Sequence, residues 1–220
     1  MACMAEALGM SLPGNAAIPA VDANRKVLAQ LSGIRIVEMV KEDMKISDIL
    51  TRKAFENAIK VNAAVGGSTN FVIHLLAIAG RIGAPLTIDD FDIVRSSLPL
   101  MVNLQPSGRY FMEDFYYAGG LQAVMREIGD HLHKDCITVN GRNVGENIRN
   151  AENINTDVIA SINAPFKKDS GVIVLKGNIC AHGAVIKPNA ISEQLRKHSG
   201  KAVVFENIEE YKERIDDPDL

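Results

Sequence analysis

Hydrophobic residues recur at helical spacing through most of the first 150 residues, and this periodicity predicts a helix-rich region. The first stretch has the pattern of a helix that ends at Gly9. Further helices are predicted at residues 22–41, 51–65, 70–82, 87–97, 111–131 and 144–150.

Glycine and polar residues indicate where these helices begin and end. Glycine pairs at 66–67 and 119–120 break the helical pattern. Thr87 and Asp90 have the spacing of a capping box, with Asp in place of the usual Glu, so a helix is expected to begin there.

The pattern changes in the last third of the chain. Residues 151–169 are rich in Asn, Asp, Ser and Lys, which favours a linker or a domain boundary. Beyond them, short apolar runs are typical of strands, and a final helix follows at 208–215. Strands are predicted at residues 172–175, 184–186 and 202–205, with two earlier short ones at 100–104 and 137–139.

Composition excludes several classes of protein. Apolar residues make up 47% of the chain and charged residues 23%, so a packed core is expected. The formal net charge of −3 provides no basic surface for nucleic acid. The longest apolar run, 71–79, is too short to span a bilayer. The first residues lack the positively charged region of a signal peptide, so a cytoplasmic location is expected.

The beginning of the chain suggests a fragment. Residues 1–9 resemble the later part of a helix without an N-cap, and residues 216–220 follow a helix with no further element. Domains rarely begin within a helix, so we expect this chain to be an internal piece of a longer protein.

Cysteine and histidine give no metal-binding signature. Cys3, Cys136 and Cys180 are odd in number and form no CxxC pair, so free thiols are expected. His131 and His133 lie near a helix end with no second ligand pair, and we predict no metal site there.

The GGSTN segment at residues 66–70 is the clearest candidate for ligand binding. Free N–H groups at a helix N-terminus, with hydroxyl side chains beside them, form an anion site. An ordinary turn between helices, capped by Ser68 or Thr69, explains the same residues. Spacing alone leaves both interpretations open and favours the turn.

Two other clusters favour structural roles. Glu113 and Asp114 are adjacent on a helix, so they do not face one ligand. Cys180 and His182 lie in a glycine-containing connection between strands, without a third group to activate the thiol.

Several motifs in this order resemble the dihydroxy-acid and phosphogluconate dehydratase family, and they span nearly the whole chain. They are EALGMSLP at 6–13, GGSTN at 66–70, PSG at 106–108, MED at 112–114 with GG at 119–120, VLKGN at 174–178 and GAVIK at 183–187. The stretches 12–19 and 109–119 resemble most closely the sugar-acid branch, which includes arabinonate and xylonate dehydratases. The dihydroxy-acid dehydratase of branched-chain amino-acid synthesis is the next most similar.

The resemblance implies a hydro-lyase that converts a 2,3-dihydroxy acid into a 2-keto acid. In this family an iron–sulfur cluster acts on the leaving hydroxyl, a magnesium ion holds the carboxylate and 2-hydroxyl, and a serine removes the C2 proton. The motifs that carry the cluster cysteines, the metal ligands and this serine are absent here. We therefore assign no catalytic and no metal-binding residue, and expect this chain to bind neither cofactor and to be inactive alone.

The resemblance also gives the expected architecture and substrate contacts. The α/β fold is expected to comprise the later part of an N-terminal α/β domain (1–155), a linker (156–169) and the first strands of a C-terminal β-barrel-like domain (170–220). Substrate binding is predicted for Ser68, Thr69, Asn70 and Asn178. The full-length family protein is expected to form a homo-oligomer and to act on a small acid, without nucleic-acid or membrane partners. The alternative is a small-anion-binding module without catalysis.

Overall fold

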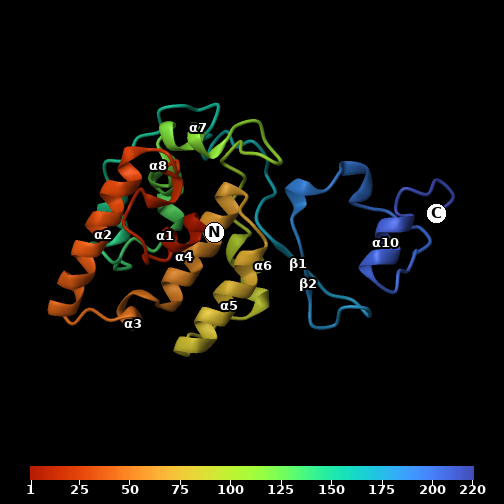
Figure 1. The fold of residues 1–220 in the computed structure, drawn as a ribbon, viewed down its shortest axis with the longest axis horizontal. Helices are drawn as coiled ribbons and strands as arrows, with labels where there is room; N and C mark the ends of the chain where they lie inside the picture. Colours follow the sequence, from red (N-terminus) through yellow and green to blue (C-terminus); the bar gives the residue numbers. More distant parts are fainter. The chain divides into compact units, whose positions relative to one another are not determined.

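The computed structural model describes residues 1–220, which form two compact units at residues 1–190 and 191–220 (Figure 1). The first unit contains the helices α1 (Ala2–Ala7), α2 (Ala23–Lys41), α3 (Ile46–Ile49), α4 (Arg52–Val65), α5 (Asn70–Ile82), α6 (Ile88–Arg95), α7 (Met112–Tyr117), α8 (Gly120–Glu127) and α9 (Val144–Ile148). It also contains strands β1 (Ile173–Leu175) and β2 (Ala184–Ile186), and single 3-10 turns at Asn15–Ala17, Gly129–His131 and Pro188–Ala190.

Helix α4 forms the centre of the first unit. The Thr51 hydroxyl caps its N-terminus by accepting a hydrogen bond from the Ala54 N–H (3.3 Å). Nine of its side chains are buried, and it contacts α1, α6 and α8. Several of the buried side chains are alanines, which allow the neighbouring helices to approach closely.

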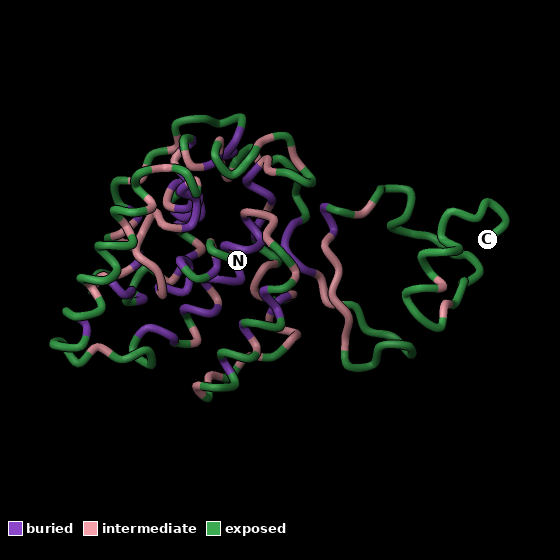
Figure 2. Tube along the Cα trace, in the orientation of Figure 1, coloured by how far each residue is buried: buried purple, intermediate pink, exposed green.

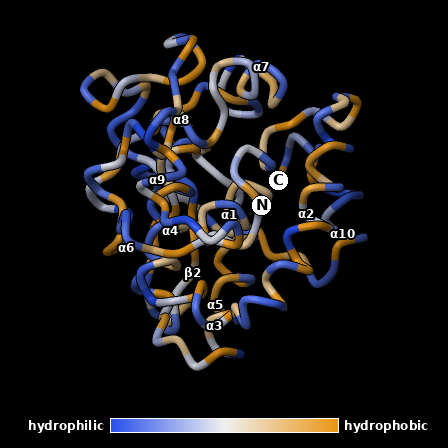
Figure 3. The backbone as a smooth tube through the Cα atoms, turned by 90° about the vertical axis from the view of Figure 1, so that its left-hand side faces the viewer, coloured by the Kyte–Doolittle hydropathy of each residue, from blue (hydrophilic) through white to orange (hydrophobic).

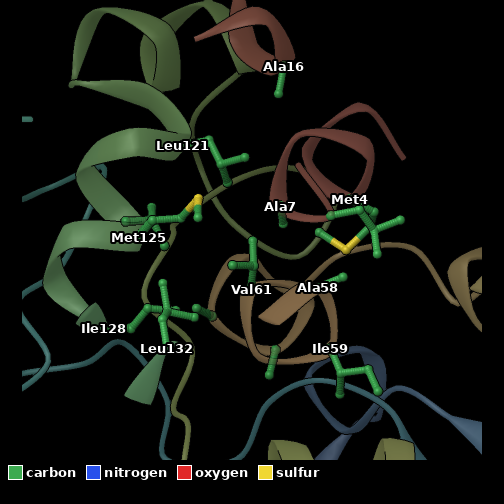
Figure 4. Packing of buried hydrophobic residues seen from close by; sticks show 14 of the residues in the cluster. Met4, Ala7, Ala16, Ala58, Ile59, Val61, Leu121, Met125, Ile128 and Leu132 are labelled. Atoms are coloured by element: carbon green, nitrogen blue, oxygen red, sulfur yellow. The ribbon is translucent and has the colours of Figure 1, made fainter. Parts of the chain in front are cut away.

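The core around α4 is apolar and continuous. Met4 and Ala7 of α1, Val61 of α4 and Leu121 of α8 belong to one cluster of buried residues (Figure 4). Burial of each large apolar side chain contributes about 1.5–3 kcal/mol to the free energy of unfolding. This core fixes the end of α4, and with it the loop that follows.

Two glycines allow α4 to turn sharply into α5. Gly66 has a φ of +61°, and a Cβ on it would lie 2.7 Å from Cδ1 of Leu100. A Cβ on Gly67 would lie 2.3 Å from Nδ2 of Asn62. Neither position has room for a side chain, so the GGSTN loop passes close to the end of α4.

The predicted start of α6 is confirmed. The Asp90 carboxylate accepts hydrogen bonds from the Thr87 N–H (2.7 Å) and hydroxyl (2.9 Å). It also forms a bidentate ion pair with the Arg52 guanidinium, with N–O distances of 2.6 and 3.0 Å. Asp90 therefore links the first turn of α4 to the first turn of α6.

Helix α2 is exposed along most of its length (Figure 2). The Asp22 carboxylate caps it, and Nε of Arg35 donates a hydrogen bond to the Val139 carbonyl oxygen (2.6 Å). Apolar side chains nevertheless remain in solvent, among them Val27 and Val40, and Figure 3 shows hydrophobic stretches along this helix.

Residues 156–169, expected to form a linker, are packed into the first unit. The Leu100 N–H donates to the Lys167 carbonyl oxygen (2.8 Å), and the Ala160 N–H donates to the Met101 carbonyl oxygen (2.7 Å). Ile159 is fully buried. The segment is held by main-chain hydrogen bonds, although its polar composition favours an exposed connection.

The predicted strands are only partly confirmed. Those at Ile173–Leu175 and Ala184–Ile186 form an antiparallel hairpin. Segments 100–104 and 137–139 form isolated bridges rather than strands, because their pairing is confined to single residues. The strand predicted at 202–205 is wrong, since these residues pair with no neighbour and Val204 is 79% exposed.

The second unit, residues 191–220, contains a 3-10 turn at Glu193–Leu195 and helix α10 (Ile208–Arg214). The Asn207 side chain caps α10 by accepting a hydrogen bond from the Glu210 N–H (2.9 Å). The Phe205 and Tyr211 rings pack edge to face at 5.4 Å. In neither unit is any helix both long enough and apolar enough to cross a bilayer.

Replacing Gly66 by Ala is expected to lower the free energy of unfolding by about 1–3 kcal/mol, because the positive φ and the Leu100 contact both oppose a Cβ. Gly80→Ala in α5 is the matched control, since its Cβ would meet no atom within 4 Å. This control should gain about 0.5–1 kcal/mol from helix propensity. Urea unfolding measures both variants, and a loss of equal size in the two would contradict the geometry described above.

Asp90→Asn tests the link between α4 and α6. The Arg52 guanidinium lowers the pKa of Asp90 from 3.8 to about 2, so this ion pair stabilises the fold above pH 4. Its contribution is lost as the pH falls from about 4 to about 2. After allowance for solvent screening, the variant should be about 1–2 kcal/mol less stable than the wild type at pH 7 and nearly as stable as the wild type near pH 2. Stability that differs from the wild type by the same amount at both pH values would exclude this ion pair as the cause.

Candidate functional site

A cavity of about 580 Å³ lies at the C-terminal end of α4. The first residues of α1, the loop at 66–69, residues 104–106 and the start of α7 line it, together with Lys187. Its volume lies within the usual range for a small-molecule site. The chemistry of its polar groups decides which ligands fit.

The loop contributes hydrogen-bond donors that have no partner within the chain. The backbone N–H groups of Ser68 and Thr69 donate to no acceptor. The Ser68 hydroxyl accepts a hydrogen bond from the Asn70 N–H (3.2 Å), whereas the Thr69 hydroxyl makes no hydrogen bond. These groups precede the 13-residue helix α5, whose N-terminus carries a partial positive charge.

Asn62 places an unpaired acceptor beside the same loop. Its side chain is fully buried and lines the cavity. Nδ2 lies 3.5 Å from the Ser68 carbonyl oxygen, and Oδ1 has no hydrogen-bond partner. A buried unpaired acceptor costs about 1–3 kcal/mol, so a hydroxyl donor in the cavity would relieve this cost.

Lys187 is a cation in the cavity wall, directly after strand β2. Its side chain is half-buried and forms no ion pair or hydrogen bond. Burial lowers the pKa of its ammonium group below the ordinary value. An anion in the cavity would restore the stability of the charged form.

The predicted substrate-binding residues fall in two places. Ser68 and Thr69 line the cavity. Asn70 begins α5 and is exposed, and Asn178 is exposed in the loop between β1 and β2, so neither lines it. The sequence did not identify Asn62 or Lys187 as site residues. No spacing pattern connects either of them with the GGSTN loop, and Lys187 is distant from that loop in the sequence.

The cysteines do not supply a metal-binding set. Cys3 lines the cavity, but burial raises the pKa of its thiol to about 11. Cys136 is buried and Cys180 is exposed. No three side chains of His, Cys, Asp or Glu come together in an arrangement that could hold a metal ion. This chain therefore brings together no complete donor set for an iron–sulfur cluster or a magnesium ion.

The histidine-rich segment has structural partners. Nε2 of His133 lies 2.6 Å from Oε2 of Glu56 in α4. Nζ of Lys53 forms an ion pair with Asp135 at 2.6 Å. These contacts attach the segment to α4 and account for its charged residues without a metal ion.

Comparisons with known proteins point to one family. The family description "Dihydroxy-acid/6-phosphogluconate dehydratase N-terminal" matches residues 1–147, and the corresponding C-terminal description matches residues 157–220. The L-arabinonate dehydratase of Rhizobium leguminosarum bv. trifolii (strain WSM2304) is 55% identical over 98% of this chain, and the L-arabonate dehydratase of Azospirillum brasilense is 56% identical over all of it. The dihydroxy-acid dehydratase of Caldicellulosiruptor saccharolyticus is 46% identical over 98%.

The matched region covers 38% of each arabinonate dehydratase and 39% of the dihydroxy-acid dehydratase. The chain thus spans less than half the length of these relatives. Its ordered motifs, the two family matches and these identities agree. The chain belongs to the dihydroxy-acid/6-phosphogluconate dehydratase family.

Proposed function

We propose that this chain is part of a hydro-lyase that dehydrates a small 2,3-dihydroxy acid to a 2-keto acid, and that it contributes one wall of the substrate pocket. Family membership supports the reaction class. The observation that carries the role of this chain is the cavity at the GGSTN loop, where Ser68 and Thr69 present unpaired N–H groups.

A sugar acid such as arabinonate or xylonate is the proposed substrate class. The relatives named for arabinonate have a higher identity to this chain than the dihydroxy-acid dehydratase described above. A dihydroxy acid of branched-chain amino-acid synthesis is the second candidate. Asn70 and Asn178 remain proposed contacts that require surfaces beyond this cavity.

The proposal assigns binding and orientation of the acid to this chain. In the family, a cluster and a magnesium ion supply the Lewis acid that weakens the bond to the leaving hydroxyl. Because this chain lacks a donor set for either group, their ligands would have to lie in other parts of the enzyme. We accordingly expect the 220-residue chain alone to be inactive and free of cluster.

Three further features belong to the proposal. The first is the division into an α/β domain at 1–155, a linker at 156–169 and the start of a β-barrel-like domain at 170–220. The separate family matches at 1–147 and 157–220 support two domains, although residues 157–169 fall within the C-terminal match. The second is a homo-oligomer, supported by the exposed apolar side chains of α2. The third is a cytoplasmic location, as expected from the sequence.

A small-anion-binding module without catalysis is the competing function. The same free N–H groups support it, since they suit any small oxyanion. The two functions differ in turnover: the module binds an acid and leaves it unchanged.

The decisive experiment uses the product of the complete reading frame that encodes this chain, purified anaerobically with iron, sulfide and magnesium. Formation of 2-keto acid from L-arabinonate, xylonate and dihydroxyisovalerate is expected, with the highest kcat/KM for a sugar acid. Thr69→Val should lower kcat/KM roughly 5- to 20-fold, because the hydroxyl that it removes has no structural partner. Thr156→Val, at an exposed position outside the cavity, is the matched control.

No turnover of any of the three acids, together with saturable acid binding, would replace the proposed function by the anion-binding module. Turnover by the 220-residue chain alone would instead show that the chemistry lies within it. An effect of Thr69→Val equal to that of Thr156→Val, on kcat/KM or, where there is no turnover, on acid binding, would show that the Thr69 hydroxyl does not bind the acid.

A further inference from the structure

Lys187 occupies a fixed position between a strand and a buried turn. Pro188 and Asn189, which follow it, are both buried. The Asn189 carbonyl oxygen accepts a hydrogen bond from Nζ of Lys167 (3.3 Å), and its side chain donates to the Ser107 hydroxyl (3.3 Å). The backbone at Lys187 is thus tied to the 105–107 turn, part of which lines the cavity.

The ammonium of Lys187 lacks the partner that a half-buried cation normally has. None of the acidic side chains of the chain pairs with it, whereas Lys176 at the other end of the hairpin pairs with Asp89 (2.7 Å). Lysine side chains usually extend to keep their charged ends in water. A desolvated ammonium without a counter-ion is costly, which favours an anionic ligand at this position.

The other polar groups of the cavity limit what that ligand can be. The N–H groups of Ser68 and Thr69 require acceptors, and Oδ1 of Asn62 requires a donor. An inorganic anion without protons would leave Asn62 unpaired, and a neutral polyol would leave Lys187 without a counter-ion. A hydroxy acid satisfies both, because it carries a carboxylate and hydroxyl donors in one small molecule.

We propose that Lys187 is a substrate-binding residue that neutralises the carboxylate of the hydroxy acid, while Asn62 accepts a hydrogen bond from a hydroxyl of the same molecule. This inference deepens the proposed function and rests on it for the identity of the ligand. A carboxylate has two oxygens with two lone pairs each, so a lysine and a metal ion elsewhere in the enzyme can share it. No covalent step is assigned to Lys187.

The test measures ligand binding to the 220-residue chain by isothermal titration calorimetry at pH 7. L-arabinonate should bind more tightly than L-arabinitol, its neutral analogue, and than sulfate, an inorganic anion that has no proton to donate to Asn62. Lys187→Met should weaken L-arabinonate binding roughly 10- to 100-fold, the effect of losing one charge-assisted hydrogen bond, and leave L-arabinitol binding unchanged. Lys187→Arg should retain most of the affinity because it retains the charge.

Lys176→Met is the matched control, since this lysine belongs to the same hairpin and lies outside the cavity. It should not change L-arabinonate binding. Circular dichroism and the Tm of each variant check that the fold is retained. Asn62→Asp provides a second test, because it places a negative charge beside the bound carboxylate. Asn62→Asp should weaken the binding of L-arabinonate more than the binding of L-arabinitol.

Three results would overturn the inference: no binding of L-arabinonate to the folded chain, equal losses in Lys187→Met and Lys176→Met, or equal losses for the acid and the polyol. The proposed function fails differently, through absence of turnover by the product of the complete reading frame. Binding that depends on Lys187, without turnover, would therefore support this inference and contradict the proposed dehydratase function. Turnover that is unchanged in Lys187→Met would support the dehydratase function and contradict this inference.

Discussion

The close packing of α4 is the constraint on which the site depends. Its buried face holds α1 and α8 in one core, and its last turn must give way to a left-handed residue at Gly66. Asn62 on the same helix leaves no space for a side chain at Gly67. The loop therefore passes across the end of α4, where the Gly66 and Gly67 N–H groups pair with α4 carbonyl oxygens and those of Ser68 and Thr69 stay unpaired beside the cavity.

The polar groups around this cavity complement one another. Donors come from the loop before α5, an acceptor comes from Asn62, and a cation comes from Lys187 after β2. Each is held by a different element, so the arrangement requires the tertiary fold rather than any one motif. A small acid with hydroxyl groups is the simplest ligand that pairs all of them, which agrees with the substrates named for the relatives.

Sequence reasoning predicted the helices well because their periodicity, caps and glycine breaks are local. Helix α5 was predicted with its observed bounds, and the Thr87–Asp90 capping pair was predicted correctly. The strand at 202–205 was wrong, because β-propensity does not provide a pairing partner. Glu6 shows the same limit: its carboxylate is buried and accepts hydrogen bonds from the Gly14 and Ala16 N–H groups (both 2.7 Å), contacts that only the fold creates.

Within the site, local signals located Ser68 and Thr69 but not the residues that give the cavity its charge and its acceptor. No local pattern distinguishes Lys187 and Asn62 in the sequence. Only the fold shows that it buries each of them, wholly or in part, and leaves the Lys187 ammonium and Oδ1 of Asn62 without a partner. A crystal structure of the chain with L-arabinonate tests this account most directly. It should show the carboxylate within about 3 Å of Nζ of Lys187 and of the Ser68 or Thr69 nitrogen, with a hydroxyl on Oδ1 of Asn62. An acid bound elsewhere, or a cavity left to water at saturating ligand, would contradict it.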